Sequence, residues 1–241
     1  MAAHRHRGQS TRFPATFAGT AVLAGLLVAT GLVGCTGPGS LFAEEDPNRT
    51  QWRAEAEAQC LAETPPKETA TLKAVDALEG PNGICGTEHP FEVTALPVVG
   101  TALSPAATLS CPMIPALDRW MATIVQPAAE ATFDQPVKRL NVAASYVCRG
   151  RNNQKGARIS EHAFANAIDI ASFELADGRT ITVTEGWSGK DDEQAFLRAV
   201  HKGSCEHFFT VIGPEGDDYH RTHFHLDLAR RAAKGGYRYC K

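Results

Sequence analysis

Three histidines are crowded into a short segment near the C-terminus of the 241-residue chain, in the order His220-Arg-Thr-His223-Phe-His225. Because successive side chains of a β-strand point to opposite faces, His223, His225 and Asp227 would lie on one face of a strand here. The hydrophobic residues between them would point into the core. Polar groups gathered in this way on one face indicate a site for metal binding or proton transfer.

A carboxylate interrupts an apolar segment upstream. In Ile168-Asp169-Ile170 the two isoleucines would face one way and Asp169 the other. Burial of an unpaired carboxylate costs roughly several kcal/mol or forces the group to take a proton, whereas a divalent cation compensates the charge. For His162 and Asp169 alone, a capping role or a hydrogen bond in the core would be the simpler interpretation.

The two segments together supply the ligands of a zinc site. Zinc accepts imidazole nitrogen and carboxylate oxygen, and a catalytic site keeps three protein ligands and a fourth position for water. We therefore expect His162, Asp169 and His225 to bind one Zn²⁺ ion. His223 lies two residues from a ligand on the same strand face, and it is the expected general base that takes a proton from the water.

The motifs resemble those of a group of zinc peptidases. Residues 160–169, SEHAFANAID, match the pattern SxHxxxxAxD, and HFH at 223–225 matches a terminal HxH. Both patterns occur in the D-Ala-D-Ala carboxypeptidases and dipeptidases, the penicillin-insensitive murein endopeptidase and the hedgehog fold. The arrangement His220-x2-His223-x-His225 is similar to that of the endopeptidase, whereas the dipeptidases have a glutamate in the base position.

A longer stretch, from about Cys85 to Cys240, resembles the bacterial extensin-like C-terminal family. The resemblance rests on SYVCR, SEHAFANAIDIASF, GSC and HFHLDLA. It implies a hedgehog or D-Ala-D-Ala peptidase-like fold and the zinc ligands and base named above. It also implies that Arg149 stabilises the oxyanion of a scissile carbonyl and that Ser160 contacts the substrate. In the mechanism that we expect, either Arg149 or His220 stabilises this oxyanion.

The chain departs from the zinc peptidase pattern at two places. Ala165 stands where the SxHxxG spacing has a glycine, and the loop RGRNNQKGARI at 149–159 is long. Neither departure removes a ligand. Arg149 would also suit a surface salt bridge, and Asp227 would suit either a hydrogen bond to a ligand imidazole or a place among surface charges.

A cupin is an alternative for the HFH motif alone, because cupins also carry HxH on a strand. The cupin glutamate three or four residues further on is missing here, where the chain continues Leu226-Asp227-Leu228-Ala229. A second alternative is a protein that binds zinc but does not catalyse hydrolysis, as in the hedgehog fold. A purely structural zinc site usually closes with four ligands, often cysteines, so three ligands beside a base favour an enzyme.

The N-terminus has the pattern of a bacterial lipoprotein signal. Arg5, Arg7 and Arg12 precede an apolar run over residues 17–33, and the segment ends in Leu-Val-Gly-Cys35, which resembles a lipobox. We therefore expect a signal peptide at 1–34, a lipid on Cys35 that anchors the exported protein to a membrane on its periplasmic or outer side, and a flexible tether over 35–58. The formal net charge of −3 argues against nucleic-acid binding.

Six cysteines remain after Cys35, an even number in a compartment that oxidises thiols. Three disulfides are expected, and their connectivity is left open because six cysteines allow fifteen pairings. Cys148 beside Arg149 is therefore expected in a disulfide rather than as a nucleophile. The chain has no CxxC pair, which argues against a zinc ribbon or a thioredoxin-like site.

Hydrophobic periodicity over residues 59–241 predicts one α+β domain with a mainly antiparallel sheet flanked by helices. Helices are expected over 111–133, with Pro127 as a kink or break, and over 190–201, and strands over 137–148, 166–175, 179–187, 207–213 and 223–229. We expect a monomer that hydrolyses peptide bonds in the stem or cross-link of peptidoglycan. The alternative is a non-catalytic zinc lipoprotein that binds or organises wall peptides.

Overall fold

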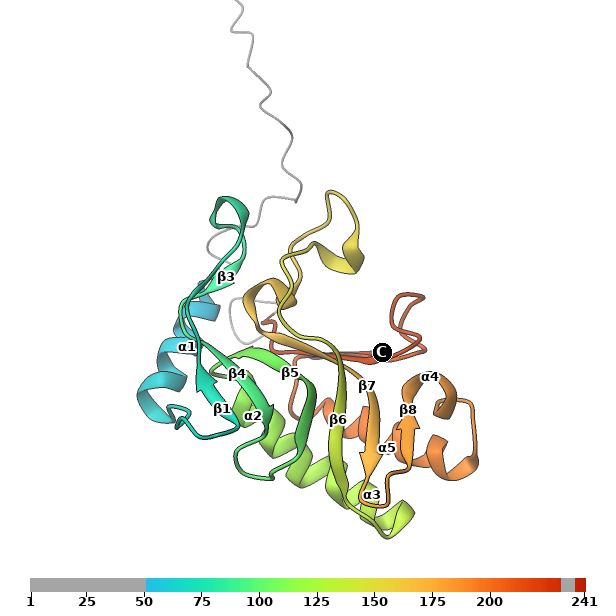
Figure 1. Ribbon diagram of the computed structural model, residues 1–241. Helices are drawn as coiled ribbons and strands as arrows, with labels where there is room; N and C mark the ends of the chain where they lie inside the picture. The colour runs from blue at the N-terminus through green and yellow to red at the C-terminus, as the bar shows by residue number, and fades with distance from the viewer. Residues whose placement is uncertain (1–50, 231–236) are drawn as a thin grey trace, which may run out of the picture. The chain divides into compact units, whose positions relative to one another are not determined.

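A mixed sheet forms the centre of the fold (Figure 1). The computed structural model describes residues 51–230 and 237–241. Within them the strand order is β1-β4-β5-β6-β7-β10-β9-β11, with β8 also paired to β7. Neighbours are antiparallel except for β5 with β6 and β9 with β11. The bounds are β1 (Leu72–Ala74), β4 (Pro90–Ala95), β5 (Ala102–Ser110), β6 (Val137–Ala144), β7 (Ala167–Leu175), β8 (Thr180–Thr182), β9 (Thr210–Ile212), β10 (Phe224–Asp227) and β11 (Tyr239–Cys240).

Helices flank this sheet, as the sequence predicted. The described helices are α1 (Trp52–Glu63), α2 (Met113–Trp120), α3 (Gln126–Phe133), α4 (Val183–Gly186) and α5 (Asp191–Ser204). Shorter turns are η2 (Pro81–Gly83), η4 (Arg151–Asn153) and η5 (Glu161–Phe164), and a small second sheet pairs β2 (Leu78–Glu79) with β3 (Gly86–Thr87). The α+β class with a mainly antiparallel sheet is therefore confirmed. None of the helices in the described ranges is long and apolar enough to span a membrane.

The expected helix over 111–133 is continuous but changes geometry near its centre. Between α2 and α3 the five residues of η3 (Met121–Val125) form a π-helical turn just before Pro127. Proline has no N–H and its ring clashes with the carbonyl four residues earlier, and a wider turn accommodates both effects. Pro127 is thus accompanied by a π-turn rather than by a break.

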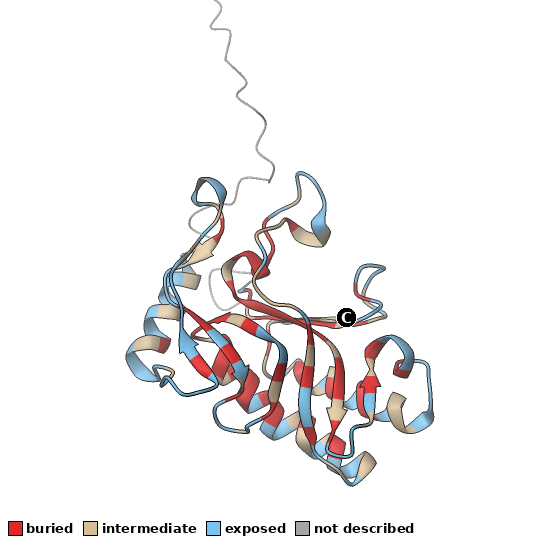
Figure 2. Cartoon of the chain, in the orientation of Figure 1, coloured by how far each residue is buried: buried red, intermediate tan, exposed pale blue. Residues whose placement is uncertain are grey.

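The hydrophobic core lies where α2, α3 and α5 cover one face of the sheet (Figures 1 and 2). Phe224 and Ile170, opposite each other on β10 and β7, are fully buried on this side. The aromatic rings of Phe173 and Phe208 lie 6.3 and 5.9 Å from Trp120 on α2. Because side chains alternate along a strand, the neighbours of these core residues must project from the opposite face.

One predicted strand is wrong in its second half. Residues 179–187 form the short strand β8 and then the helix α4 rather than one strand. The hydroxyl of Thr182 accepts a hydrogen bond from the backbone N–H of Glu185 at 3.2 Å and caps this helix. A threonine followed three residues later by a glutamate is a known helix-start signal, and it outweighed the β-branched composition here.

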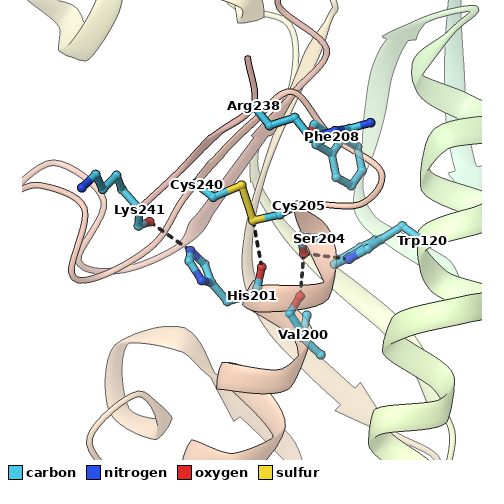
Figure 3. The surroundings of a disulfide bond; sticks show 9 residues. All are labelled: Trp120, Val200, His201, Ser204, Cys205, Phe208, Arg238, Cys240 and Lys241. Carbon is cyan, nitrogen blue, oxygen red and sulfur yellow. Dashed lines mark hydrogen bonds between the residues drawn. A yellow bond between two sulfur atoms is a disulfide. The ribbon is translucent and has the colours of Figure 1, made fainter.

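Three disulfides join the six described cysteines, as expected, in the pairs Cys60–Cys111, Cys85–Cys148 and Cys205–Cys240. The third joins the C-terminal end of α5 to β11 (Figure 3). Beside it, Trp120 Nε1 donates a hydrogen bond to Ser204 Oγ at 2.8 Å, and His201 Nε2 donates to the carbonyl of Lys241 at 3.0 Å. Disulfides in this number indicate an exported protein that folds in an oxidising compartment.

The N-terminal expectations fall partly outside the described residues. The expected signal peptide at 1–34, the expected lipidation site Cys35 and most of the expected tether lie outside them. The end of the segment expected as a flexible tether is helical, because α1 begins at Trp52. Cys60 on this helix is tied to Cys111, so α1 belongs to the folded domain.

Candidate metal centre

The three predicted ligands come together at one point on the face of the sheet opposite α2, α3 and α5. Strands β7 and β10 pair antiparallel with His225 directly opposite Asp169, so both side chains leave the sheet on the same side. His162 comes from η5, the turn that precedes β7. The exposed fractions of His162, Asp169 and His225 are 0%, 3% and 8%.

The ligand atoms lie close enough to share one cation. Asp169 Oδ1 is 2.8 Å from His225 Nδ1 and 3.1 Å from His162 Nε2, and the two imidazole nitrogens are 3.1 Å apart. Ligands bound to tetrahedral zinc at roughly 2.0 to 2.2 Å lie about 3.4 Å from one another. The separations and the two-imidazole, one-carboxylate donor set therefore fit a zinc ion.

The outer nitrogen of each ligand imidazole is held by an acceptor. His162 Nδ1 donates to the backbone carbonyl of Ser145 at 2.5 Å, and His225 Nε2 donates to Asp227 Oδ2 at 3.0 Å. Asp227 Oδ1 in turn accepts the backbone N–H of Ala229 at 2.9 Å. When a ring is neutral, these bonds keep its hydrogen on the outer nitrogen and direct the inner lone pair toward Asp169, as in metal sites with a supporting outer shell. A ring that carries a second proton donates it to Asp169.

Two lone pairs and a carboxylate thus converge in a buried space and require a positive charge. Burial disfavours the ionised form of Asp169, but hydrogen bonds from His162 and His225 outweigh it and hold the pKa of Asp169 well below its usual range. Burial also disfavours imidazolium at His225, yet Asp169 and Asp227 raise the pKa of His225 to about 10. The cluster binds a proton strongly, and a metal ion would satisfy the same need with better geometry.

His223, the predicted base, lies at the edge of this cluster. Its Nε2 is 3.6 Å from Asp169 Oδ2 and its side chain is 15% exposed, while Nδ1 lies 3.2 Å from the hydroxyl of Thr222. Burial lowers the pKa of His223, so the ring is neutral at neutral pH and can accept a proton. The structure places this imidazole between the ligand carboxylate and solvent.

His220 is brought to the same place. Its ring centroid lies 5.2 Å from that of His223 and 5.6 Å from that of His225, and its Nδ1 donates to Asp217 Oδ1 at 2.6 Å. Burial lowers the pKa of His220, although Asp217 acts in the opposite direction. His220 is therefore a neutral imidazole, oriented by Asp217, whose Nε2 is able to accept a hydrogen bond.

Arg149 lies near the same oxygen of Asp169 as His223, and its guanidinium is only loosely held. Nη2 is 3.8 Å from Asp169 Oδ2 and Nη1 is 3.4 Å from the carbonyl of Gly150. The disulfide of the preceding residue, Cys148, ties this point of the chain to Cys85. A cation near the cluster with weak bonds of its own retains donors for a ligand.

Ser160 is buried, and its backbone N–H donates to the carbonyl of Arg149 at 3.1 Å. The bond closes the long loop 149–159 into a hairpin, which Gly150 and Ile159 bridge. A cavity of about 200 Å³ beside the hairpin reaches the ligand His225. Arg149, Arg151, Ser160, His220 and Asp217 are among the residues that line it. The predicted substrate-side residues therefore border one small cavity next to the metal centre.

The backbone conformation at Ala165 explains why the SxHxxG pattern has a glycine at this position. Its φ of 52° is left-handed, where glycine is favoured over residues with a Cβ. The turn reverses the chain between η5 and β7, and the carbonyl of Ala165 accepts a hydrogen bond from Ser110 N at 2.8 Å. Alanine occupies this turn at a cost of about 1 kcal/mol.

Sequence reasoning missed two parts of the site. The carbonyl of Ser145, which holds His162, has no side-chain signal because any residue supplies a backbone oxygen. Glu161 is 3% exposed although it lies between two motif residues. A charged residue inside an otherwise buried motif could have been recognised as requiring a partner.

One protein family, described as the extensin-like protein C-terminus, has a sequence model that matches residues 58–241. The matched range includes His162, Asp169 and His225. No curated protein and no solved structure matches the chain significantly.

Proposed function

The chain belongs to the family of the extensin-like protein C-terminus, and we propose that it is an exported zinc hydrolase that cleaves peptide bonds of peptidoglycan, in the stem peptide or the cross-link. The observation that carries the proposal is the convergence of His162 Nε2, His225 Nδ1 and Asp169 Oδ1, each buried and within 3.1 Å of the others. Three ligands with neutral imidazoles beside them are typical of a catalytic rather than a structural zinc site.

Zinc in this position would supply Lewis acidity toward a carbonyl and would lower the pKa of water. The protein supplies the other parts of the reaction. His223 Nε2 accepts the proton of the attacking water and can return it to the leaving amine. The Arg149 guanidinium, which has weak bonds of its own, faces the oxyanion that develops on the scissile carbonyl.

His220 and Ser160 act on the substrate side in this proposal. Asp217 fixes the Nδ1–H tautomer of His220, so that its Nε2 can accept a hydrogen bond from the substrate or relay a proton from His223. Ser160 lines the small cavity in which a side chain next to the scissile bond would lie.

The substrate class rests on location and on motif resemblance. An exported enzyme has no pool of nucleotide cofactors, so a reaction that needs only water fits its compartment. The SxHxxxxAxD and HxH motifs resemble those of peptidases that act on peptidoglycan. A lipid on Cys35 would hold the domain at the membrane, next to the wall.

A two-part experiment tests the function. The purified protein is first analysed for bound metal, and one zinc per chain is expected. It is then incubated with cross-linked muropeptides, and new products with free amino or carboxyl groups are sought by mass spectrometry. Zinc with no product would favour a non-catalytic protein that binds or organises wall peptides, and no metal under any condition would reject the proposal.

A further inference from the structure

The first turn of helix α1 is joined to the turn that carries the ligand His162. Arg53 of α1 forms a bidentate pair with Glu161, with Nε 2.9 Å from Oε2 and Nη2 2.5 Å from Oε1. The side chains of Arg53 and Glu161 are 16% and 3% exposed. The pair is therefore partly buried, with a buried carboxylate and a half-buried guanidinium, and its residues are 108 positions apart in the chain.

Glu161 also bonds Asn166, the residue that joins the segments carrying the other two proposed ligands. Its Oε2 accepts a bond from Asn166 Nδ2 at 2.8 Å, and its carbonyl accepts the Asn166 N–H at 3.1 Å. Asn166 directly precedes β7, and its own carbonyl accepts the N–H of Leu228 just after β10, at 3.4 Å. The carboxylate of Glu161 thus fixes η5 against the start of β7, and the backbone of Asn166 in turn links the start of β7 to the end of β10.

The guanidinium of Arg53 also stacks on an aromatic ring of η5, the turn whose Glu161 it hydrogen-bonds. It lies 4.0 Å from the ring centroid of Phe164, the last residue of η5, and 5.0 Å from that of Trp52. Glu161 and Phe164 flank His162 on either side in sequence. A planar, delocalised cation can bond and stack at once, which a lysine ammonium cannot do in this geometry.

We propose that Arg53 is a positioning residue for the metal centre: by compensating Glu161 it fixes the η5 turn and thereby the imidazole of His162. Without Arg53, the carboxylate of Glu161 would be buried without its cation, and the turn would have to open to hydrate it. Opening the turn moves His162 away from Asp169 and His225, and metal affinity falls. The proposal depends on the proposed function only in that the site binds a metal.

The test measures zinc affinity of the full chain by competition with a chelator, together with the melting temperature of the metal-free protein. We expect Arg53→Met to weaken zinc binding by about tenfold or more, the range typical of lost outer-shell support. Arg53→Lys keeps the positive charge but loses the bidentate guanidinium, so its zinc affinity should lie between those of the wild type and Arg53→Met. The matched control is Arg139→Met, which removes an arginine–glutamate pair between β6 and β7 away from the site and should leave affinity unchanged.

The outcomes are distinct. If Arg53→Met lowers the melting temperature but keeps a zinc affinity within twofold of wild type, Arg53 has a merely structural role and the inference is overturned. Tighter zinc binding by Arg53→Met also overturns it. If Arg53→Met does not fold, Arg53→Lys decides: affinity equal to wild type overturns the inference, and a loss of severalfold supports it. A wild-type chain that binds no zinc would instead reject the proposed function.

Discussion

His225 of β10 lies directly opposite Asp169 of β7, and its Nδ1 is 2.8 Å from the carboxylate Oδ1. Opposite residues of an antiparallel pair project from the same face, so strand pairing alone brings these two groups together. Asp227, two residues on, holds the other nitrogen of the same imidazole. Substitutions in this row should therefore change metal affinity before they change the stability of the sheet.

Asp169→Asn should lose zinc. The substitution preserves shape but removes the charge that compensates the cation, so affinity should fall by more than the roughly 10- to 100-fold typical of an outer-shell change. Metal content after dialysis, with a chelator titration, measures the effect. Asp192→Asn, at a surface pair with Arg179, is the matched control and should keep its zinc. Equal zinc in both variants would remove Asp169 from the ligand set.

His223→Ala should keep zinc and lose turnover. The imidazole borders the ligands, and removal of a general base typically lowers the rate by about 10²- to 10⁴-fold. The rate of product formation from cross-linked muropeptides, measured by mass spectrometry, is the readout. His89→Ala, at an exposed histidine, provides the comparison and should match wild type. Wild-type turnover in His223→Ala would mean that another group accepts the proton.

Asp227→Asn should weaken zinc binding by about 10- to 100-fold without abolishing it, because the charged acceptor behind the His225 ring is lost. Asp217→Asn is the informative comparison, since Asp217 supports His220 rather than a proposed ligand. Chelator competition should show near wild-type zinc affinity for Asp217→Asn. The same loss in both variants would indicate a general effect of charge rather than support of a ligand.

Zinc affinity should increase with pH. Hydrogen bonds to Asp169 and Asp227 outweigh burial and raise the pKa of His225 to about 10, so below that pH the metal-free site holds a proton that zinc must displace. Displacement of one proton lowers the dissociation constant about tenfold per pH unit between pH 6 and 8. Titrations at three pH values in non-chelating buffers check the slope. A constant affinity over this range would show that the metal-free cluster carries no proton.

Much of the candidate metal centre followed from local sequence patterns. Because side chains alternate along a strand, Asp169 projects from the face opposite to Ile168 and Ile170, whichever strand pairs with it. For the same reason His225 projects from the face opposite to Phe224. The family resemblance and the even number of cysteines were likewise readable from the chain. The start of α4 was also encoded locally, by Thr182 and Glu185, but β-branched residues concealed it.

Only the tertiary structure decided which segments meet. The register that sets His225 opposite Asp169, the partners of the six cysteines and the pair of Arg53 with Glu161 all join residues far apart in sequence. The alternation of polar and apolar residues predicts the face of a strand from which each side chain projects, because that face depends only on position along the strand. It carries no information on the partner across that face, which is selected by the packing of the whole chain.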